Sequence, residues 1–373
     1  MKVLVVSGGY PSKKNPINHI FIHNQVKALQ KRGIDISVLE IDVRSIRRKR
    51  KLGFFRDGFE GVTVYRMAIP CGPVPYLLPL LAKISVNYAF KKIVKTFGKP
   101  DILHAHFGEV AAWVIPIKLK YNIYLTVTEH FSKVMRMNRT KRVRLYSKKA
   151  YENADALIAV SNILRDNMRD LTNKNIVVVP NVLPTYFSFK NVKKSQNFTY
   201  MSVGNLNYGK RFDITIKAFS QINKKYPDTR LIIVGIGELE DELISLVCEN
   251  NITEKTEFLG AIPNDKLPDI YSSCHCFVLP SMFETFGVVY AEAIACGIPV
   301  VATKCGGPED FVNDSNGLIV PTDDLESVIG AMEYMYKNAK KYDGDKISVA
   351  TLEKLNEERI GKSLVNIYEN LFE

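Results

Sequence analysis

Cysteine is scarce in this chain of 373 residues, and the six cysteines are widely scattered. Only Cys274 and Cys276 lie close together, in a Cys-His-Cys run. A structural zinc site needs a second matching pair, and the sequence has none. We therefore expect the cysteines to be small buried residues of a reduced protein, and we predict no metal site.

Long hydrophobic runs are also missing. No segment reaches the roughly 18 consecutive apolar residues that a membrane span needs. The segment Met1–Val6 combines one lysine with a short apolar run, but Ser7-Gly8-Gly9 ends that run too early for the core of a signal peptide. We interpret it as a buried first strand and expect a cytoplasmic protein.

Acidic residues are few in the first half of the chain. Residues 1–190 contain 33 Lys and Arg against 12 Asp and Glu, whereas residues 191–373 contain 18 against 27. Basic residues cluster at 44–51, at 91–95 and from 133 to 149. This asymmetry indicates an anionic partner for the N-terminal half, such as nucleic acid, a membrane surface or a phosphorylated acceptor. Nucleic acid is the least favoured, because no aromatic-basic recognition module is visible.

Short apolar runs of strand length alternate with helix-length segments along the chain, which favours parallel sheets covered by helices on both faces. Residues 184–198 are polar and irregular, and we place a domain boundary there. The predicted domains are residues 1–185 and 186–354, and a last helix from about 355 to 373 is free to pack back on the first domain. The predicted strands are 2–7, 36–41, 102–106, 124–128, 156–160, 176–179, 198–203, 231–234, 256–259, 276–279 and 299–302.

Two glutamates stand after one of these strands. The strand ends at Leu279, a loop follows, and a helix is predicted to open near Thr285. Glu284 and Glu292 are eight residues apart, which places them on roughly the same side of a helix about 12 Å apart. Carboxylates accept paired sugar hydroxyls, and a helix start attracts a diphosphate, so the pair suits a nucleotide sugar. Two ordinary helix acids explain the same spacing.

Glycine-rich loops follow other strands. Gly204-Asn205 leads to Lys210-Arg211, which suits phosphate, although a plain turn with solvated bases would look the same. Gly235-x-Gly237 lacks the third glycine of a dinucleotide-binding motif, so hydride transfer is disfavoured.

In the N-terminal half, Gly9 follows the first strand, and His106 and His130 end two others. The carboxyl ends of parallel strands are where open α/β sheets bind ligands. His104 and His106 alternate on one strand and therefore point to the same face. A single strand-end histidine is more often structural than functional, and two at one edge reduce that margin.

The motif Pro-Ser-Met-Phe-Glu-Thr-Phe-Gly-Val-Val-Tyr-Ala-Glu-Ala, at residues 280–293, closely resembles the hallmark of retaining glycosyltransferases of family 4. The match continues through residues 297–303 and 306–307, and Gly204, Lys210 and Gly235 stand in the family order. The resemblance covers most of the chain and is looser in the first domain. It implies the GT-B fold: an α/β protein of two facing, doubly wound Rossmann-like domains with a cleft between them.

The family implies roles for the matching positions. Glu292 would hold the ribose of a UDP- or GDP-sugar, and Glu284 would contact the donor sugar. Lys210 and the helix start at Phe286-Gly287 would bind the diphosphate without a metal ion or other cofactor. His106 would stand near the reacting centre, which makes His106, Glu284 and Lys210 the catalytic candidates. The predicted donor-binding residues are Gly9, Gly204, Asn205, Lys210, Arg211, Gly235, Glu284, Phe286, Gly287 and Glu292.

The sequence departs from the family pattern at three places. Asn205 replaces the usual arginine of the phosphate loop, and Arg211 is the candidate to compensate. The usual glycine pair on the acceptor side is replaced around Asn18-His19, so His19 and His130 are the acceptor-side candidates. Val182 follows Asn181 where glycine is common.

We therefore predict a retaining, metal-independent glycosyltransferase that acts on a lipid-linked or surface-polysaccharide acceptor. The basic N-terminal domain favours docking on an anionic membrane at its inner face, and the stretch Pro75–Ile84 could add apolar contact or simply begin a buried helix. Two alternatives remain open. One is a nucleotide-sugar epimerase of the same architecture, and the other is a non-catalytic sugar-nucleotide-binding protein, which Asn205 alone supports.

Overall fold

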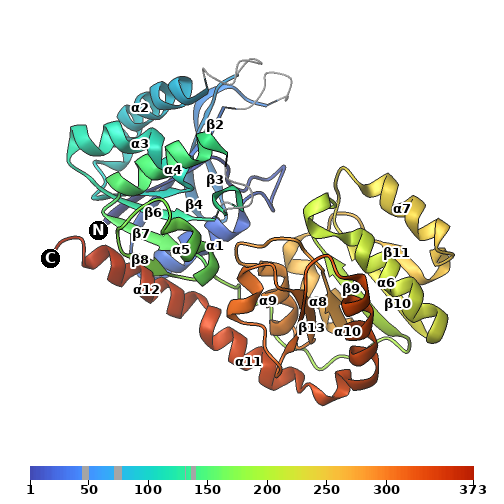
Figure 1. Ribbon diagram of the computed structural model, residues 1–373. Helices are drawn as coiled ribbons and strands as arrows, with labels where there is room; N and C mark the ends of the chain where they lie inside the picture. Colours follow the sequence, from blue (N-terminus) through green and yellow to red (C-terminus); the bar gives the residue numbers. More distant parts are fainter. Residues whose placement is uncertain (44–49, 71–77, 131, 136–139) are drawn as a thin grey trace. The chain divides into compact units, whose positions relative to one another are not determined.

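The computed structural model describes residues 1–43, 50–70, 78–130, 132–135 and 140–373 (Figure 1). Most of the predicted basic run at 44–51 and part of the stretch Pro75–Ile84 fall outside these ranges, as do residues 136–139 of the third basic cluster. The chain divides into two compact units. Unit 1 comprises Met1–Val182 and Glu357–Glu373, and unit 2 comprises Leu183–Asn356.

Unit 1 is built on a sheet whose described strands follow the order β3-β4-β2-β1-β5-β6-β7-β8. All neighbours pair in parallel except β3 and β4. The strands are β1 (Lys2–Ser7), β2 (Asp35–Asp42), β3 (Gly53–Phe59), β4 (Val62–Ala68), β5 (Ile102–His106), β6 (Tyr124–Glu129), β7 (Ala156–Ala159) and β8 (Ile176–Val178). The helices are α1 (Ile20–Lys31), α2 (Leu78–Phe97), α3 (Gly108–Tyr121), α4 (Lys141–Asn153), α5 (Asn162–Met168) and α12 (Glu357–Glu369).

Central strands of this sheet are apolar almost throughout, because helices cover both faces. In β1 every residue after Lys2 is buried. The sequence did not predict β3 and β4. Strand β3 lies at the sheet edge and is largely exposed, so its sequence carries charged residues and lacks the buried apolar run of a central strand.

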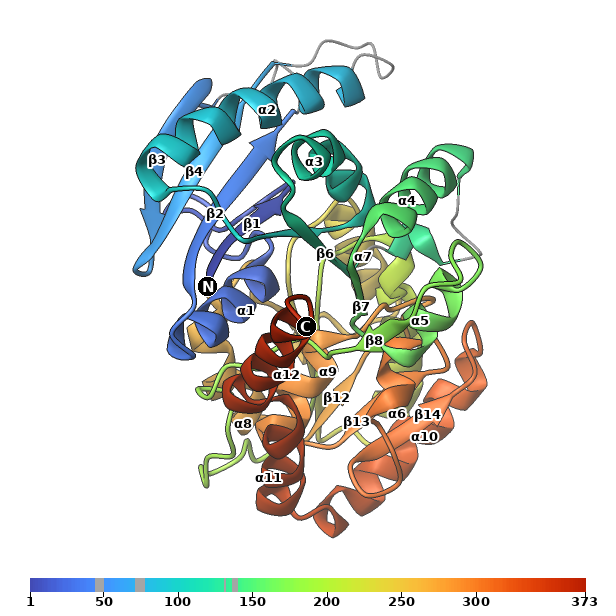
Figure 2. The ribbon, with the colours of Figure 1, turned by 90° about the vertical axis from the view of Figure 1, so that its left-hand side faces the viewer.

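Helix α12 returns to unit 1 at the end of the chain and lies beside α1 (Figure 2). Its buried residues Ile360, Leu364 and Tyr368 join the same core as Leu29 of α1. Gly361 allows the close approach, since a Cβ there would lie 2.9 Å from the carbonyl oxygen of Ala28. The last helix predicted from about 355 to 373 corresponds to α12, and a separate helix, α11 (Gly344–Leu355), precedes it.

Unit 2 has a fully parallel sheet in the order β11-β10-β9-β12-β13-β14. The strands are β9 (Phe198–Val203), β10 (Thr229–Val234), β11 (Thr256–Phe258), β12 (Cys276–Val278), β13 (Val300–Thr303) and β14 (Gly317–Val320). The helices are α6 (Phe212–Lys225), α7 (Glu240–Glu249), α8 (Leu267–Ser273), α9 (Val288–Ala295), α10 (Leu325–Asn338) and α11. The half-buried edge strand β14 was not predicted from the sequence.

The chain passes between the units twice, after Val182 and after Asn356. Within unit 2 the amide of Leu183 donates to the carbonyl oxygen of Leu355 at 2.8 Å, so the two crossings are neighbours. No helix within the described ranges has both the length and the apolar character needed to cross a bilayer.

Candidate active site

The strongest candidate site lies where the strand order of unit 2 reverses, between β9 and β12. Open α/β sheets bind ligands at the carboxyl ends of the strands at such a point. Lys210 follows β9 and Glu284 follows β12, and the structure brings them together: Lys210 Nζ lies 2.5 Å from Glu284 Oε1. Ser281 Oγ donates to the same oxygen at 3.0 Å. The side chain of Glu284 is only 10% exposed, so this ion pair lies in a partly desolvated place where charge interactions are strong.

Glu284 is held by its backbone in a loop, not in a helix. Its amide donates to the carbonyl oxygen of Cys305 at 2.8 Å, and its carbonyl accepts from the Gly307 amide at 2.9 Å. The helix predicted to open near Thr285 begins at Val288, so the argument that Glu284 and Glu292 share one side of a helix was wrong. The loop instead pairs with the Gly306-Gly307 turn after β13, which fixes the carboxylate independently of the helix.

Glu292 lies in the second turn of α9 and is almost completely buried. Tyr271 of α8 donates a hydrogen bond to Glu292 Oε2 at 3.2 Å. Burial raises the pKa of Glu292 to about 7, and the hydrogen bond from Tyr271 opposes this rise only in part. No hydrogen bond joins Glu292 to Lys210 or Glu284 among the described residues, so the two predicted acids occupy separate surroundings.

Phe286 and Gly287 form the junction between the Glu284 loop and α9. Gly287 precedes the helix with a φ of 81°, and a Cβ there would lie 2.8 Å from the Tyr290 ring and 2.9 Å from Pro308. A Cβ on Gly307 would lie 2.3 Å from the Cα of Phe286. Both glycines therefore serve tight packing that brings the α9 start to the loop. The first amides of a helix lack partners within it, so this start is suited to an anion.

The predicted phosphate loop after β9 is held by the loop after β10. Gly235 has a φ of 141°, and a Cβ there would lie 1.8 Å from the carbonyl oxygen of Gly204. The two backbones touch directly, so Gly235 shapes the Gly204 loop. Asn205, the residue after Gly204, is exposed.

Arg211 is already engaged by two carboxylates. Its guanidinium pairs with Asp213 at 3.0 Å and also with Asp323. The backbone of Arg211 is left-handed, with a φ of 52°, where it precedes α6. The structure therefore gives no support to Arg211 as a replacement for the arginine that Asn205 displaces.

Unit 1 has a similar reversal between β1 and β5, and three histidines stack beside it. The rings of His104 and His106 lie 4.6 Å apart, and those of His106 and His130 lie 5.2 Å apart. His106 Nδ1 and His130 Nε2 share a hydrogen bond of 2.9 Å. Burial lowers the pKa of all three, to about 3 for His104 and His130, so the stack is neutral at physiological pH.

The three histidines differ in what they bind. His104 bonds Tyr368 of α12 at 2.6 Å and Thr128 at 2.7 Å, which makes it a structural residue. His106 Nε2 is buried and has no hydrogen-bond partner among the described residues. His106 therefore has the capacity to bind a polar group that His104 lacks.

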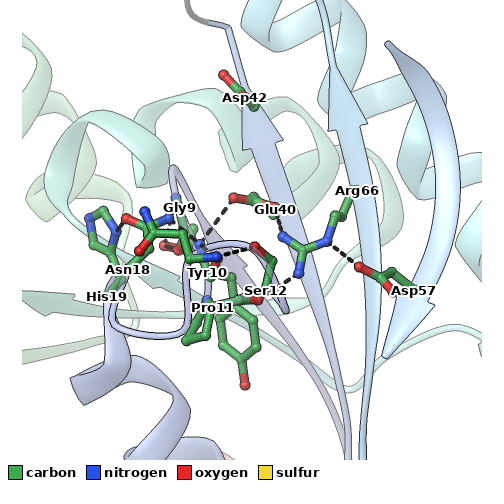
Figure 3. A network of polar contacts seen from close by, with 12 residues as sticks. Gly9, Tyr10, Pro11, Ser12, Asn18, His19, Glu40, Asp42, Asp57 and Arg66 are labelled. Carbon is green, nitrogen blue, oxygen red and sulfur yellow. Dashed lines mark hydrogen bonds and ion pairs between the residues drawn. The ribbon is translucent and has the colours of Figure 1, made fainter. Parts of the chain in front are cut away.

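The other unit 1 candidates, Gly9 and His19, lie against each other in the loop after β1 (Figure 3). A Cβ on Gly9 would lie 2.5 Å from His19 Nδ1, so any larger residue there would displace the His19 ring. His19 precedes α1 in a left-handed conformation with a φ of 54°, and its Nδ1 bonds Asn18 Oδ1 at 2.8 Å.

The same view shows a buried network that sequence reasoning missed (Figure 3). Arg66 of β4 pairs with Glu40 of β2 and with Asp57 of β3, and its Nη2 donates to the carbonyl oxygen of Pro11 at 2.6 Å. Glu40 accepts from the Tyr10 amide at 3.1 Å. The network fixes the loop that carries Gly9 and His19. Only recognition of the β3–β4 hairpin would have placed Arg66 here.

Sequence-family comparison divides the chain at nearly the same place. Residues 19–185 match Glycosyltransferase Family 4, and residues 185–344 match Glycosyl transferases group 1. An uncharacterized glycosyltransferase of Haemophilus influenzae is 28% identical over 86% of each chain. Another, MJ1607 of Methanocaldococcus jannaschii, is 32% identical over 45% of this chain and 43% of its own length.

A third relative is N-acetylgalactosamine-N,N'-diacetylbacillosaminyl-diphospho-undecaprenol 4-alpha-N-acetylgalactosaminyltransferase of Campylobacter jejuni. It is 36% identical over 38% of each chain. Among solved structures, sucrose-phosphate synthase from Thermosynechococcus elongatus aligns with a TM-score of 0.82 at 20% identity, over 100% of this chain and 99% of the other.

Anabaena HepE in complex with UDP aligns with a TM-score of 0.75 at 17% identity, over 99% of this chain and all of the other. The fold is thus that of the GT-B enzymes, with two Rossmann-like domains. Both matched families are families of glycosyltransferases, and each match lies mainly in one of the two units. The chain belongs to the glycosyltransferases, with a family 4 domain followed by a group 1 domain.

Proposed function

We propose that this protein is a retaining glycosyltransferase that moves a sugar from a nucleotide-diphosphate sugar to a lipid-linked or surface-polysaccharide acceptor without a metal ion. The observation that carries the proposal is the pair Lys210–Glu284 at the carboxyl edge of the unit 2 sheet. A cation and a carboxylate at this edge match the two ends of a sugar diphosphate.

Each residue then has a defined task. Lys210 binds the diphosphate with the help of the α9 start and stabilises the negative charge that grows on the leaving group. Glu284 exchanges its bond with Lys210 for hydroxyls of the donor sugar. Glu292 accepts hydrogen bonds from the ribose, and His106 binds a polar group of the sugar near the reacting centre. His19 and His130 belong to the acceptor side.

The names of similar proteins support the choice of substrates. HepE was crystallised with UDP, and the Campylobacter jejuni relative is named for a diphospho-undecaprenol-linked sugar. A lipopolysaccharide outer core galactosyltransferase, WaaB, has the same fold. These names favour a nucleotide sugar as donor and a lipid-linked glycan as acceptor.

The direct test is thermal stabilisation of the intact protein by a panel of UDP- and GDP-sugars. The proposal expects one donor to raise the Tm of the wild type and to lose most of that effect in Glu284→Gln. Glu249→Gln, an exposed acid on α7, is the matched control. Absence of any Tm shift across the panel would count against a donor site.

Product analysis tests the finer claims. Transfer with retention gives a new glycosidic bond of the donor's anomeric configuration, which NMR reads directly, and the rate should be unchanged by EDTA. A product in which an altered sugar remains attached to its nucleotide would identify an epimerase instead.

We further propose that unit 1 docks on the inner face of an anionic membrane through α2. Leu80, Ile84 and Tyr88 are exposed at helical spacing on this helix, and Lys91 and Lys92 extend the surface with positive charge. The protein should co-sediment with vesicles containing phosphatidylglycerol at low salt and leave them at high salt. Equal binding to neutral vesicles would contradict the electrostatic part of the proposal.

A further inference from the structure

A cavity lies at the opposite edge of the unit 2 sheet from Lys210 and Glu284. It has a volume of about 570 Å³, which falls in the range of small-molecule sites. Its lining includes Phe198 at the start of β9 and His275 and Pro299, which directly precede β12 and β13. The donor loops follow the carboxyl ends of these parallel strands, so the cavity is separate from the donor site.

Lys194 places an amine in this cavity without a carboxylate partner. Its Nζ donates to the carbonyl oxygen of Cys274 at 2.6 Å, and no ion pair with Lys194 occurs among the described residues. Burial lowers the pKa of Lys194. A half-buried amine without a counter-charge is a favourable partner for an anion. Lys337 and Lys340 add two further amines to the lining.

His275 supplies a neutral donor beside these amines. Its Nδ1 accepts from the amide of Thr199 at 3.1 Å, so the proton of the neutral ring is on Nε2. Burial lowers the pKa of His275 to about 4, which keeps the ring neutral at physiological pH. No described residue forms a hydrogen bond with Nε2, and His275 lines the cavity.

Aromatic rings form the rest of the wall. Phe198 stacks on His275 at 4.8 Å, and Tyr336 meets Phe198 edge-on at 5.3 Å. Tyr342 and Phe189 also line the cavity. The one carboxylate in the lining, Asp228, already accepts from the Tyr336 hydroxyl at 2.9 Å, so it is partly satisfied inside the protein. Aromatic faces beside amines suit a ring that carries a phosphate.

We propose that this cavity is a second ligand site, which binds a small phosphate monoester carried on a sugar or nucleoside ring. The phosphate lies between Lys194, Lys340 and His275 Nε2, and the ring packs against the aromatic wall. This inference goes beyond the proposed transfer reaction and does not depend on it.

Calorimetric titration of the full chain tests the site with glucose 6-phosphate and adenosine 5′-monophosphate as probes. Glucose and adenosine are the phosphate-free counterparts. We expect saturable binding of at least one phosphorylated probe and none of its counterpart, and the preferred probe distinguishes a sugar from a nucleoside ring. Lys194→Met should weaken binding by about tenfold or more, the loss of one charge-assisted hydrogen bond.

Lys340 is exposed, so Lys340→Met tests the site without a risk to folding and should weaken the same titration. Lys354→Met, an exposed lysine on α11, should leave the affinity unchanged. Lys210→Met should also leave it unchanged, which separates this site from the donor loops. Absence of saturable binding at millimolar probe would overturn the proposal. So would binding that Lys210→Met abolishes and Lys194→Met leaves intact.

Discussion

Lys210 and Glu284 are the two residues on which the proposed chemistry depends most. Their amine and carboxylate form an ion pair at 2.5 Å. A bound diphosphate would share the amine with Glu284, and the sugar would share the carboxylate. The pair therefore holds each group in position for a donor.

Removal of the amine alone should affect the reaction more than the fold. We expect Lys210→Met to lower the rate of sugar transfer by about a hundredfold, because the leaving diphosphate loses a charged partner. Lys224→Met, on the exposed side of α6, is the matched control. Initial rates with a radiolabelled donor measure both, and equal rates for the two variants would remove Lys210 from the proposed mechanism.

Glu292 should make stability depend on pH. Its pKa is raised from 4.5 to about 7 by burial, so between these values the folded protein keeps a proton that the unfolded chain has released. The free energy of unfolding therefore falls as pH rises through this window, by up to about 3 kcal/mol. Glu292→Gln resembles the protonated state and should remove this loss.

Urea unfolding at pH 5 and pH 8 measures the effect. The variant should match the wild type at pH 5 and exceed it at pH 8, whereas Glu249→Gln, on the surface, should follow the wild type at both. If the free energies of unfolding of Glu292→Gln and wild type differ by the same amount at both pH values, Glu292 is not the titrating group.

At the scale of elements, glycines determine how the loops of unit 2 meet. Gly235→Ala should be strongly destabilising, by roughly 3 kcal/mol or more, because its Cβ would overlap the Gly204 carbonyl and its φ is positive. Gly330 offers a matched control, since nothing lies within 4 Å of a Cβ there and it is inside α10. Gly330→Ala should stabilise by about 0.5–1 kcal/mol. Denaturation midpoints measure both effects. If the midpoints of the two variants shift in the same direction, the predicted opposite effects are wrong.

A buried hydrogen bond between Tyr368 and His104 adds to the apolar packing that attaches α12 to the rest of unit 1. Tyr368→Phe leaves His104 Nδ1 without its partner, which should cost about 1–3 kcal/mol. Tyr334→Phe, at an exposed position of α10, should be neutral. Amide hydrogen exchange along α12 should rise only in the first variant, and unchanged exchange there would place the anchor elsewhere.

Most strands were predicted from the sequence, including β8 and β11 at sheet edges, whereas β3, β4 and β14 were not. Strands β1 and β9 are buried beyond their first residues, and each stands out in the sequence as a short uncharged run after its first residue. Strand β3 carries exposed charged residues, and β14 is only four residues long and begins with glycine, so neither gives a strong strand signal. The start of α9 was misplaced because Gly287 was read as helical, whereas its positive φ ends the loop.

Some residues of the candidate site could also be named from the sequence, and others could not. Lys210 and Glu284 follow strands within the more specific motifs of the second domain, and His106 ends a strand in the first, where the resemblance is looser. The partners Arg66 and Tyr368 were missed because they contact Pro11 and His104, which are distant from them in the chain. Ser281 was missed because its motif was interpreted only for Glu284. The ion pairs of Arg211 with Asp213 and Asp323 could not be predicted from the sequence either, because they depend on how the backbone folds.

At the scale of the whole molecule, both units are Rossmann-like, but they differ in charge. The first 190 residues are strongly basic and the rest are acidic. The basic surface belongs to the unit proposed to meet a membrane and an acceptor, and the acidic unit keeps its few site cations, such as Lys210, in partly buried places. Salt should therefore weaken membrane docking more than donor binding.

The neighbouring crossings at Leu183 and Leu355 mean that unit 2 is an insertion within unit 1. A chain in which Val182 is joined to Glu357 by a few glycines and serines should fold by itself, since α12 stays attached to the sheet that it covers. We expect this shortened chain to unfold cooperatively and to keep α12 protected in hydrogen exchange. A disordered product would show that unit 1 needs unit 2 to fold. Because the crossings at Leu183 and Leu355 are neighbours, we expect that another Rossmann-like domain could replace unit 2 at these points, with its own nucleotide specificity.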